Sequence, residues 1–452
     1  MRTGAGRALG MTLVELLVTM AVVAVVMTLV AGTLGGTLRL FGQGAKKRAS
    51  QEQARSAAAF MERTLRLAGL GVEPALTFDF SVYQGLGATC PNPGSVPPSP
   101  GCQRDFADRP DELVFYARDP AYWADSLGNP ALGVPPSPAV EGRAWLLASV
   151  AGNTLTLGMH GGELILPGQI LQVVCSGGAQ VTYVTNRTRV VNPARGAPQA
   201  VTVGAAVAGD PFNQPGPLAA SACFTDGTAR VFAVDRYRFH VQMYRDLDGQ
   251  PVPYLMLDTG LDRTGAGVAD PNNEIPIAEG IEDMQVVYER PSRPPPPNGF
   301  ETDTWVGETP GTVLDAASFC QRVTTTSGAI ACGPSDPPQG GLVLVNFAAA
   351  GANNYSTYTY QTFATASAVR QSPDAANIRT VRIALTARAV RLDQVKQAGG
   401  QPSRAFFNRT TTDGASLAQG FPALGIDDGY ERSFDVASVP IRNLLSKGVS
   451  YY

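Results

Sequence analysis

The chain has 452 residues, of which 16% are charged, and its formal net charge is -3. Without a basic excess, the composition disfavours nucleic acid as a partner. Hydrophobic residues make up 44% of the chain, which excludes a disordered protein. The 49 glycines and 35 prolines favour short strands joined by long loops. The two histidines, His160 and His240, are too few for a three-histidine metal site.

The N-terminus combines a short basic segment with a long apolar run. Arg2 and Arg7 precede the run, which extends from Met11 to Leu34 and contains one charged residue, Glu15. As a helix the run is about 36 Å long, enough to cross a hydrocarbon core of roughly 30 Å. The positive charges that precede it orient the N-terminus toward the cytoplasm. A carboxylate within an apolar span is unfavourable by about 3 kcal/mol, so Glu15 needs a partner.

The sequence around residue 10 resembles the class III signal of type IV prepilins, since Gly10 is followed by M-T-L-V-E-L-L-V. The resemblance implies that a prepilin peptidase cleaves after Gly10 and methylates the new amine of Met11, where the family often has phenylalanine. It also implies that Glu15 neutralises the amine of a neighbouring subunit in a filament, which gives the carboxylate its partner. The competing interpretations are an unprocessed membrane anchor and a signal peptide cleaved near Ala31-Gly32-Thr33.

Three segments are predicted along the chain: a leader over 1–10, an N-terminal helix over 11–70 and a β-rich head over 71–452. Within the helix, 11–34 is the membrane-embedded part and 45–69 is amphipathic. The apolar face of the second part is formed by small and aliphatic residues, namely Ala54, Ala57, Ala58, Met61, Leu65 and Ala68.

Glycine and proline end this helix, and a basic segment lies within it. Gly69-Leu70-Gly71 and Pro74 end it, because glycine and proline follow helix C-termini. Lys46-Lys47-Arg48 lies between its two halves and is interpreted as a patch facing solvent or lipid headgroups.

Past the helix, the pattern changes to strands. Apolar runs flank Gly152-Asn153, Gly177-Gly178 and Asp248-Gly249, and each arrangement predicts a β-hairpin. Apolar residues alternate with other residues over 381–388, which predicts a half-buried antiparallel strand. The predicted fold class is therefore α+β, with a long N-terminal transmembrane helix and a large, mainly antiparallel β-rich head.

Long loops interrupt the predicted head. Proline-rich segments occur at 91–100 and 291–297, and the second either divides the head near 291–300 or forms a surface excursion. The segment 318–362, rich in Gly, Ser, Thr and Ala, is predicted to be a further insertion.

Three segments of the head resemble PilW-type minor pilins. They are "GI-E-D-M-Q" with its flanks at 277–288, "VRIALTAR" within 378–388 and "VPIRN" within 438–443, and they occur in the family's order. Within the first, Ile281, Met284 and Val287 are predicted core residues. The acidic residues there are expected to cap a turn or short helix rather than to bind a metal; these are Glu279, Glu282 and Asp283.

The even number of cysteines, in a head expected to be translocated, predicts disulfides. Fifteen pairings are possible, and local pairing is the simplest. It joins Cys90 to Cys102, Cys175 to Cys223 and Cys320 to Cys332. Because the chain has no C-x-x-C spacing, zinc is not expected.

No pattern points to catalysis or to a cofactor. The sequence Asp246-Leu247-Asp248-Gly249 lacks the rest of a calcium loop and is better explained by a hairpin turn. Asp427-Asp428 lies between glycines in a predicted loop. Nucleophile-elbow, zinc-protease, phosphate-loop and dinucleotide motifs are absent from the sequence. We therefore predict that the protein is not an enzyme and holds no metal or cofactor.

The resemblance implies a minor pilin that primes or caps a type IV pilus and presents a tip adhesin, with roles in adhesion and motility. Its implied partners are the prepilin peptidase, other minor pilins, the major pilin, an adhesin and the inner membrane. The implied location is the inner membrane before assembly and the pilus tip afterwards. The alternatives are a type II secretion pseudopilin, a DNA-uptake or adhesion subunit, and a membrane-anchored hydrolase.

Overall fold

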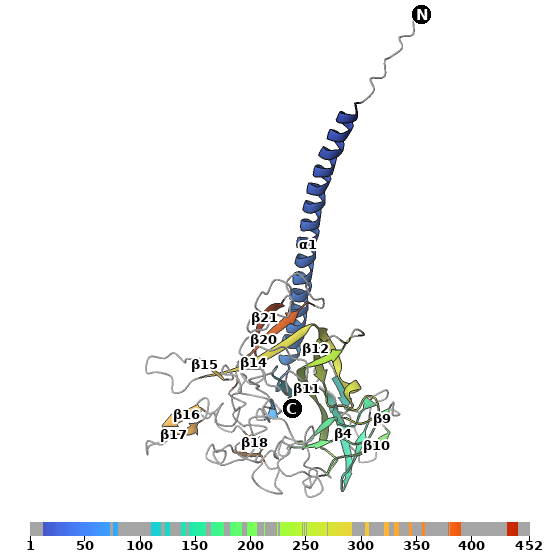
Figure 1. Cartoon of the computed structure of the whole chain (residues 1–452). Helices are drawn as coiled ribbons and strands as arrows, with labels where there is room; N and C mark the ends of the chain where they lie inside the picture. The colour runs from blue at the N-terminus through green and yellow to red at the C-terminus, as the bar shows by residue number, and fades with distance from the viewer. Residues whose placement is uncertain are drawn as a thin grey trace, which may run out of the picture.

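A computed structural model describes one long helix and an antiparallel β-rich head (Figure 1). Backbone and side chains are described over most of residues 12–72, 76–79, 110–118, 144–159, 164–175, 181–191, 197–205, 212, 224, 227–245, 247, 249, 251–268, 270–291, 378, 380–389 and 432–441. The backbone alone is described for short strands at 123–126, 137–141, 303–306, 321–324, 330–333, 343–345 and 355–357. The α+β organisation expected from the sequence is compatible with this architecture.

Helix α1 spans Leu13–Leu65, 53 residues without a proline. The predicted helix over 11–70 is thus confirmed in its main part, although turns replace the helix after Leu65. The chain reverses where Gly69 and Gly71 adopt φ of 77° and 66°, a backbone region that glycine occupies without strain. The N–H of Gly69 donates to the carbonyl oxygen of Tyr116 at 3.0 Å, which ties the end of the helix to the head.

The larger sheet is antiparallel throughout the pairs that the structure describes. Its main path is β10 (Pro198–Thr202), β5 (Thr154–Gly158), β4 (Ala144–Ala151), β11 (Arg230–Arg245), β12 (Pro251–Asp258) and β13 (Ile275–Glu279). Strands β1 (Leu113–Ala117) and β7 (Ile170–Val174) also pair with β11, and β8 (Val181–Thr185) pairs with β7. The three hairpins predicted from the turn sequences are confirmed as β4–β5, β7–β8 and β11–β12.

A smaller antiparallel sheet has the order β15 (Asp303–Val306), β14 (Ile281–Pro291), β20 (Thr380–Arg388) and β21 (Arg432–Pro440). The other described strands form the pairs β2 (Trp123–Ser126) with β3 (Ser137–Glu141), β6 (Leu164–Ile165) with β9 (Val190–Val191), β16 (Gln321–Thr324) with β17 (Ile330–Gly333), and β18 (Val343–Val345) with β19 (Tyr355–Thr357). A short 3-10 helix, η6 (Pro271–Asn273), precedes β13.

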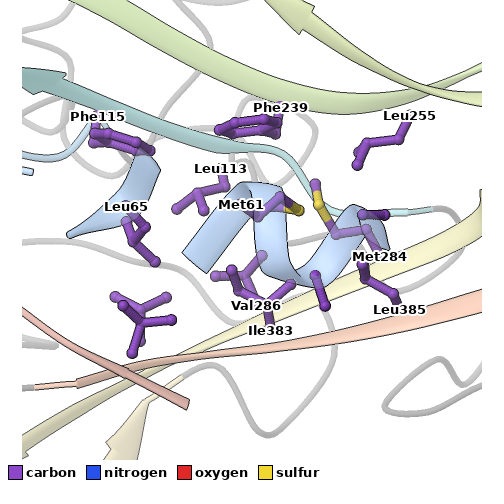
Figure 2. Packing of buried hydrophobic residues seen from close by; sticks show 14 of the residues in the cluster. Met61, Leu65, Leu113, Phe115, Phe239, Leu255, Met284, Val286, Ile383 and Leu385 are labelled. Carbon is purple, nitrogen blue, oxygen red and sulfur yellow. The ribbon is translucent and has the colours of Figure 1, made fainter. Parts of the chain in front are cut away.

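The second half of α1 lies between the two sheets. Figure 2 shows Met61 and Leu65 of the helix, both 0% exposed, with side chains of the two sheets on opposite sides. The larger sheet contributes Leu113, Phe115, Phe239 and Leu255, and the smaller sheet contributes Met284, Val286, Ile383 and Leu385. The predicted apolar face of the helix is confirmed, because all six of its residues belong to this core.

Two predictions about the smaller sheet need correction. The segment beginning at Ile281 is strand β14, so the expectation that Glu279, Glu282 and Asp283 cap a turn or helix is wrong. Strand β20 is buried on both faces at its end, since Ala384, Thr386 and Arg388 are at most 8% exposed. The half-buried pattern fails there, where the last arginine of β20, Arg388, pairs with the buried Glu282.

The predicted core residues Ile281, Met284 and Val287 are confirmed, each at 0% exposure. The proline-rich segment at 91–100, the Gly177-Gly178 turn and most of 291–300 and 318–362 lie outside the described residues. A division of the head near 291–300 stays a prediction.

Candidate functional site

The first half of α1 projects from the head (Figure 1). Every described side chain from 12 to 49 is exposed, and Ser50 is the first buried residue. The exposed side chains include Leu13 at 75%, Leu29 at 65% and Phe41 at 77%. Helix α1 is long and apolar enough to cross a membrane. A continuous apolar surface of this size requires a covering environment, because exposed apolar area is unfavourable in water.

The helix begins with a capping box formed by Thr12 and Glu15. The N–H and the hydroxyl of Thr12 each donate to the Glu15 carboxylate at 3.0 Å, and the Glu15 N–H donates to the Thr12 hydroxyl oxygen at 3.3 Å. The acidic side chain therefore lies at the positive end of the helix dipole, close to where the chain starts. Gly10 and Met11, the predicted cleavage and methylation residues, lie outside the described residues.

Hydroxyl groups within the projecting half bond to the helix itself. Each donates to the carbonyl oxygen one turn earlier, at 2.8–3.1 Å, in Thr19, Thr28, Thr33 and Thr37. Such bonds satisfy the hydroxyl without a polar partner outside the helix. Together with the unbroken backbone ladder, they leave a surface suited to lipid or to other apolar helices.

The smaller sheet brings together most of the three segments 277–288, 378–388 and 438–443. The first forms the end of β13 and most of β14, the second forms β20, and the third includes the end of β21 and the buried Ile441. Val286 pairs with Ile383, and Ile383 pairs with Ala437 on the other side. Segments separated by about a hundred and fifty residues thus form the layer against which the second half of α1 packs.

A buried acid links the strands of this sheet. The Glu282 carboxylate is 0% exposed, and Arg432 Nε donates to its Oε2 at 2.6 Å. Arg388 Nη1 lies 3.4 Å from Oε1, and its Nη2 donates to the Pro251 carbonyl oxygen on β12 of the larger sheet. Close by, the Ser433 hydroxyl donates to the Ser50 hydroxyl at 3.0 Å. This cluster connects the smaller sheet, the larger sheet and the point where α1 enters the head.

Sequence reasoning missed this cluster. The local sequence predicts an acidic turn at Glu282, whereas its two arginines lie 106 and 150 residues further along the chain. The available signal was the position of Glu282 and Asp283 between the predicted core residues Ile281 and Met284, where a charge is too unfavourable to persist unpaired.

A second charged network joins β1, β11 and β12. Arg238 contacts Glu112 at 2.8 Å and Asp258 at 3.4 Å, and Arg236 lies 3.6 Å from Asp258. Burial raises the pKa of Asp258, but Arg236, the Gly260 N–H and Arg238 outweigh it, so the pKa lies below its ordinary value of 3.8. Burial lowers the pKa of Arg238, and the neighbouring carboxylates reverse this and raise it. The network thus links β11 and β12 to Glu112, the residue that precedes β1.

The cysteine predictions are tested at one position. Cys175 is disulfide-bonded, and its partner is not among the described side chains. Cys332 lies on β17, whose backbone alone is described, whereas Cys90, Cys102, Cys223 and Cys320 lie outside the described residues. The proposed pairing therefore stays a prediction.

The described residues contain no group of three or more His, Cys, Asp or Glu side chains that could hold a metal ion. His240 Nε2 lies 3.4 Å from Glu274 Oε2, and both side chains are largely buried. His160, Asp427-Asp428 and the two aspartates of the β11–β12 turn lie outside the described residues.

Comparison with known proteins adds no relative: no family model, curated protein or solved structure matches the chain.

Proposed function

We propose that this protein is a minor pilin of a type IV pilus, within a complex that initiates pilus assembly and remains at its tip. The observation that carries the proposal is the form of α1. An apolar half projects from the head, with its one acidic residue at the N-terminus, and the same helix continues into the head core. This arrangement suits a subunit that is stored in a membrane and then packs its helix among other helices.

The disulfide at Cys175 supports a head outside the cytoplasm, because disulfides persist in oxidising compartments. We propose that the N-terminus faces the cytoplasm, the apolar half of α1 spans the inner membrane, and the head lies in the periplasm before assembly. After assembly the head would be extracellular. The proposed partners are the prepilin peptidase, other minor pilins, the major pilin and a tip adhesin.

In this proposal, Glu15 has two successive partners. Before assembly its carboxylate accepts hydrogen bonds from Thr12, as in the capping box. In the filament it pairs with the methylated amine of Met11 on a neighbouring subunit, which offsets the unfavourable transfer of a carboxylate into an apolar environment.

The first test measures the mass of the N-terminal fragment of the protein isolated from its native host. We expect a chain that starts at N-methylated Met11. Gly10→Ala abolishes this processing, whereas Gly6→Ala, a matched change within the same leader, leaves it intact. A chain that still starts at Met1, or one cut beyond Leu34, would contradict the proposal.

A second test separates processing from assembly. Glu15→Gln preserves the length and shape of the side chain but removes its charge, so we expect normal cleavage and loss of the protein from sheared pili. Recovery of the variant in pili at the wild-type level would refute the assigned role of Glu15. The pilins that co-purify with the wild-type protein distinguish a pilus from a type II secretion complex.

A further inference from the structure

The segment of α1 between its apolar half and the head carries charge of one sign. We define the basic collar as Arg39, Lys46, Lys47 and Arg48. No acidic residue occurs between Glu15 and Glu52, so nothing within this part of the helix neutralises the collar. Lys47 and Arg48 are exposed. At about 100° per residue, helical positions 46, 47 and 48 span about 200° of the circumference of the helix.

The spacing along the helix places the collar at a membrane surface. At about 1.5 Å per residue, Arg39 lies about 36 Å, Lys46 about 46 Å and Ser50 about 52 Å from Glu15. A bilayer is about 30 Å thick in its hydrocarbon core and about 40–45 Å with its headgroups. With Glu15 at the outer edge of the headgroups on one side, position 39 falls within the headgroups of the opposite side. Positions 46–48 lie just beyond them, within one screening length of about 8–10 Å.

The head presents an apolar side chain near the same level. Phe434 is 65% exposed on β21, next to Ser433, which bonds to Ser50 at the point where α1 enters the head. Figure 1 shows β21 at this end of the head. An exposed aromatic ring beside a cationic segment is a combination that favours a membrane surface.

We propose that the basic collar and Phe434 together bind an anionic lipid surface and hold the head against the membrane. The occupant is the headgroup layer of a bilayer that contains anionic phospholipid, and charge complementarity selects it. Each cation near such a surface favours binding about fivefold, so the four together give a strong, salt-sensitive attachment. This proposal rests on α1 spanning a membrane, as in the proposed function, but not on cleavage of a leader or on assembly of a pilus.

The test uses the full chain, one copy per lipid nanodisc, with brominated phospholipids that quench nearby tryptophan fluorescence. Three single variants place a tryptophan at different positions relative to the bilayer. They are Val23→Trp in the apolar half, Phe434→Trp near the collar, and Val191→Trp as an exposed control on β9. One set of discs contains phosphatidylcholine alone, and the other also contains phosphatidylglycerol at about one third of the lipid. A single copy per disc removes contacts with other subunits.

We expect quenching of Val23→Trp in both lipids, quenching of Phe434→Trp in anionic discs only, and none of Val191→Trp. In the Phe434→Trp background, we add Lys47→Gln and Arg48→Gln. The ratio of heads held against the membrane to heads that are free of it then falls by on the order of 25-fold. The matched pair Arg55→Gln and Arg63→Gln removes the same charge from the head-packed half and leaves the quenching unchanged. Raising the salt concentration weakens docking of the wild-type collar.

The inference is overturned by no quenching of Phe434→Trp in anionic discs, by equal quenching of this variant in the two lipids, or by equal effects of the two charge pairs. If Val23→Trp is not quenched, α1 does not span the bilayer and the inference fails at its first step. Because none of these readings depends on processing at Gly10, failure here is distinguishable from failure of the minor-pilin proposal.

Discussion

The buried carboxylate of Glu282 gives the sharpest test of how the head is held together. Its side chain is 0% exposed and the side chains of Arg388 and Arg432 are 5% and 6% exposed. Glu282→Gln keeps the size of the side chain but leaves two buried guanidinium groups without their shared counter-charge. Removing one partner from such a buried group costs about 3–5 kcal/mol.

The assay is urea unfolding of the full chain in detergent, followed by tryptophan fluorescence. The matched control is Glu62→Gln, because Glu62 pairs with Arg66 on the surface of α1, at 36% and 52% side-chain exposure. A surface pair one helical turn apart contributes about 0.3–0.5 kcal/mol. We therefore expect Glu282→Gln to lower the unfolding free energy by at least 2 kcal/mol more than Glu62→Gln does.

A combined variant tests the physical reason. Replacing Glu282 with leucine and both arginines with methionine removes the three charges of this ion pair cluster together, and we expect most of the lost stability to return. If Glu282→Gln costs no more than the surface control, the cluster does not stabilise the native state and the reasoning is refuted.

Three further predictions concern other parts of the head. In urea unfolding, Gly280→Ala destabilises more than Gly152→Ala, because an added Cβ at Gly280 (φ +82°) lies 2.9 Å from the Arg388 carbonyl oxygen, whereas Gly152 (φ +54°) has open space. The unfolding free energy falls as pH drops through the lowered pKa of Asp258, and Asp258→Asn makes this decline shallower in a pH series. Reduction lowers the melting temperature by breaking the Cys175 disulfide, worth about 3 kcal/mol, and Cys175→Ala reduces this response.

Local features of the fold were predictable because their causes are local. Gly152-Asn153 between apolar runs predicted a hairpin, and the structure has a two-residue turn at this place. The apolar face that includes Met61 and Leu65 predicted a packed helix half, since helical periodicity alone defines such a face. The length of the exposed apolar half could likewise be derived from the sequence.

The errors concern residues whose environment is set by distant parts of the chain. Glu282 and Asp283 have the local composition of a turn, yet they lie in a buried strand, where Arg388 and Arg432 neutralise Glu282 and Gln285 Nε2 donates to Asp283 at 3.1 Å. Thr386 is only 8% exposed, and alternation along a strand cannot indicate whether its second face is covered by distant parts of the chain. The cysteine pairing could not be derived, since it depends on which loops meet in three dimensions.

The position of α1 between the two sheets determines where the protein can be truncated. A fragment that begins after the helix, at residue 72, loses Met61 and Leu65 and uncovers the apolar faces around Phe239 and Met284. Two uncovered sheet faces favour aggregation over folding. A fragment that begins near Ser50 keeps the whole core and discards only the exposed apolar half. The boundary between the exposed apolar half and the folded head thus lies within a single continuous helix.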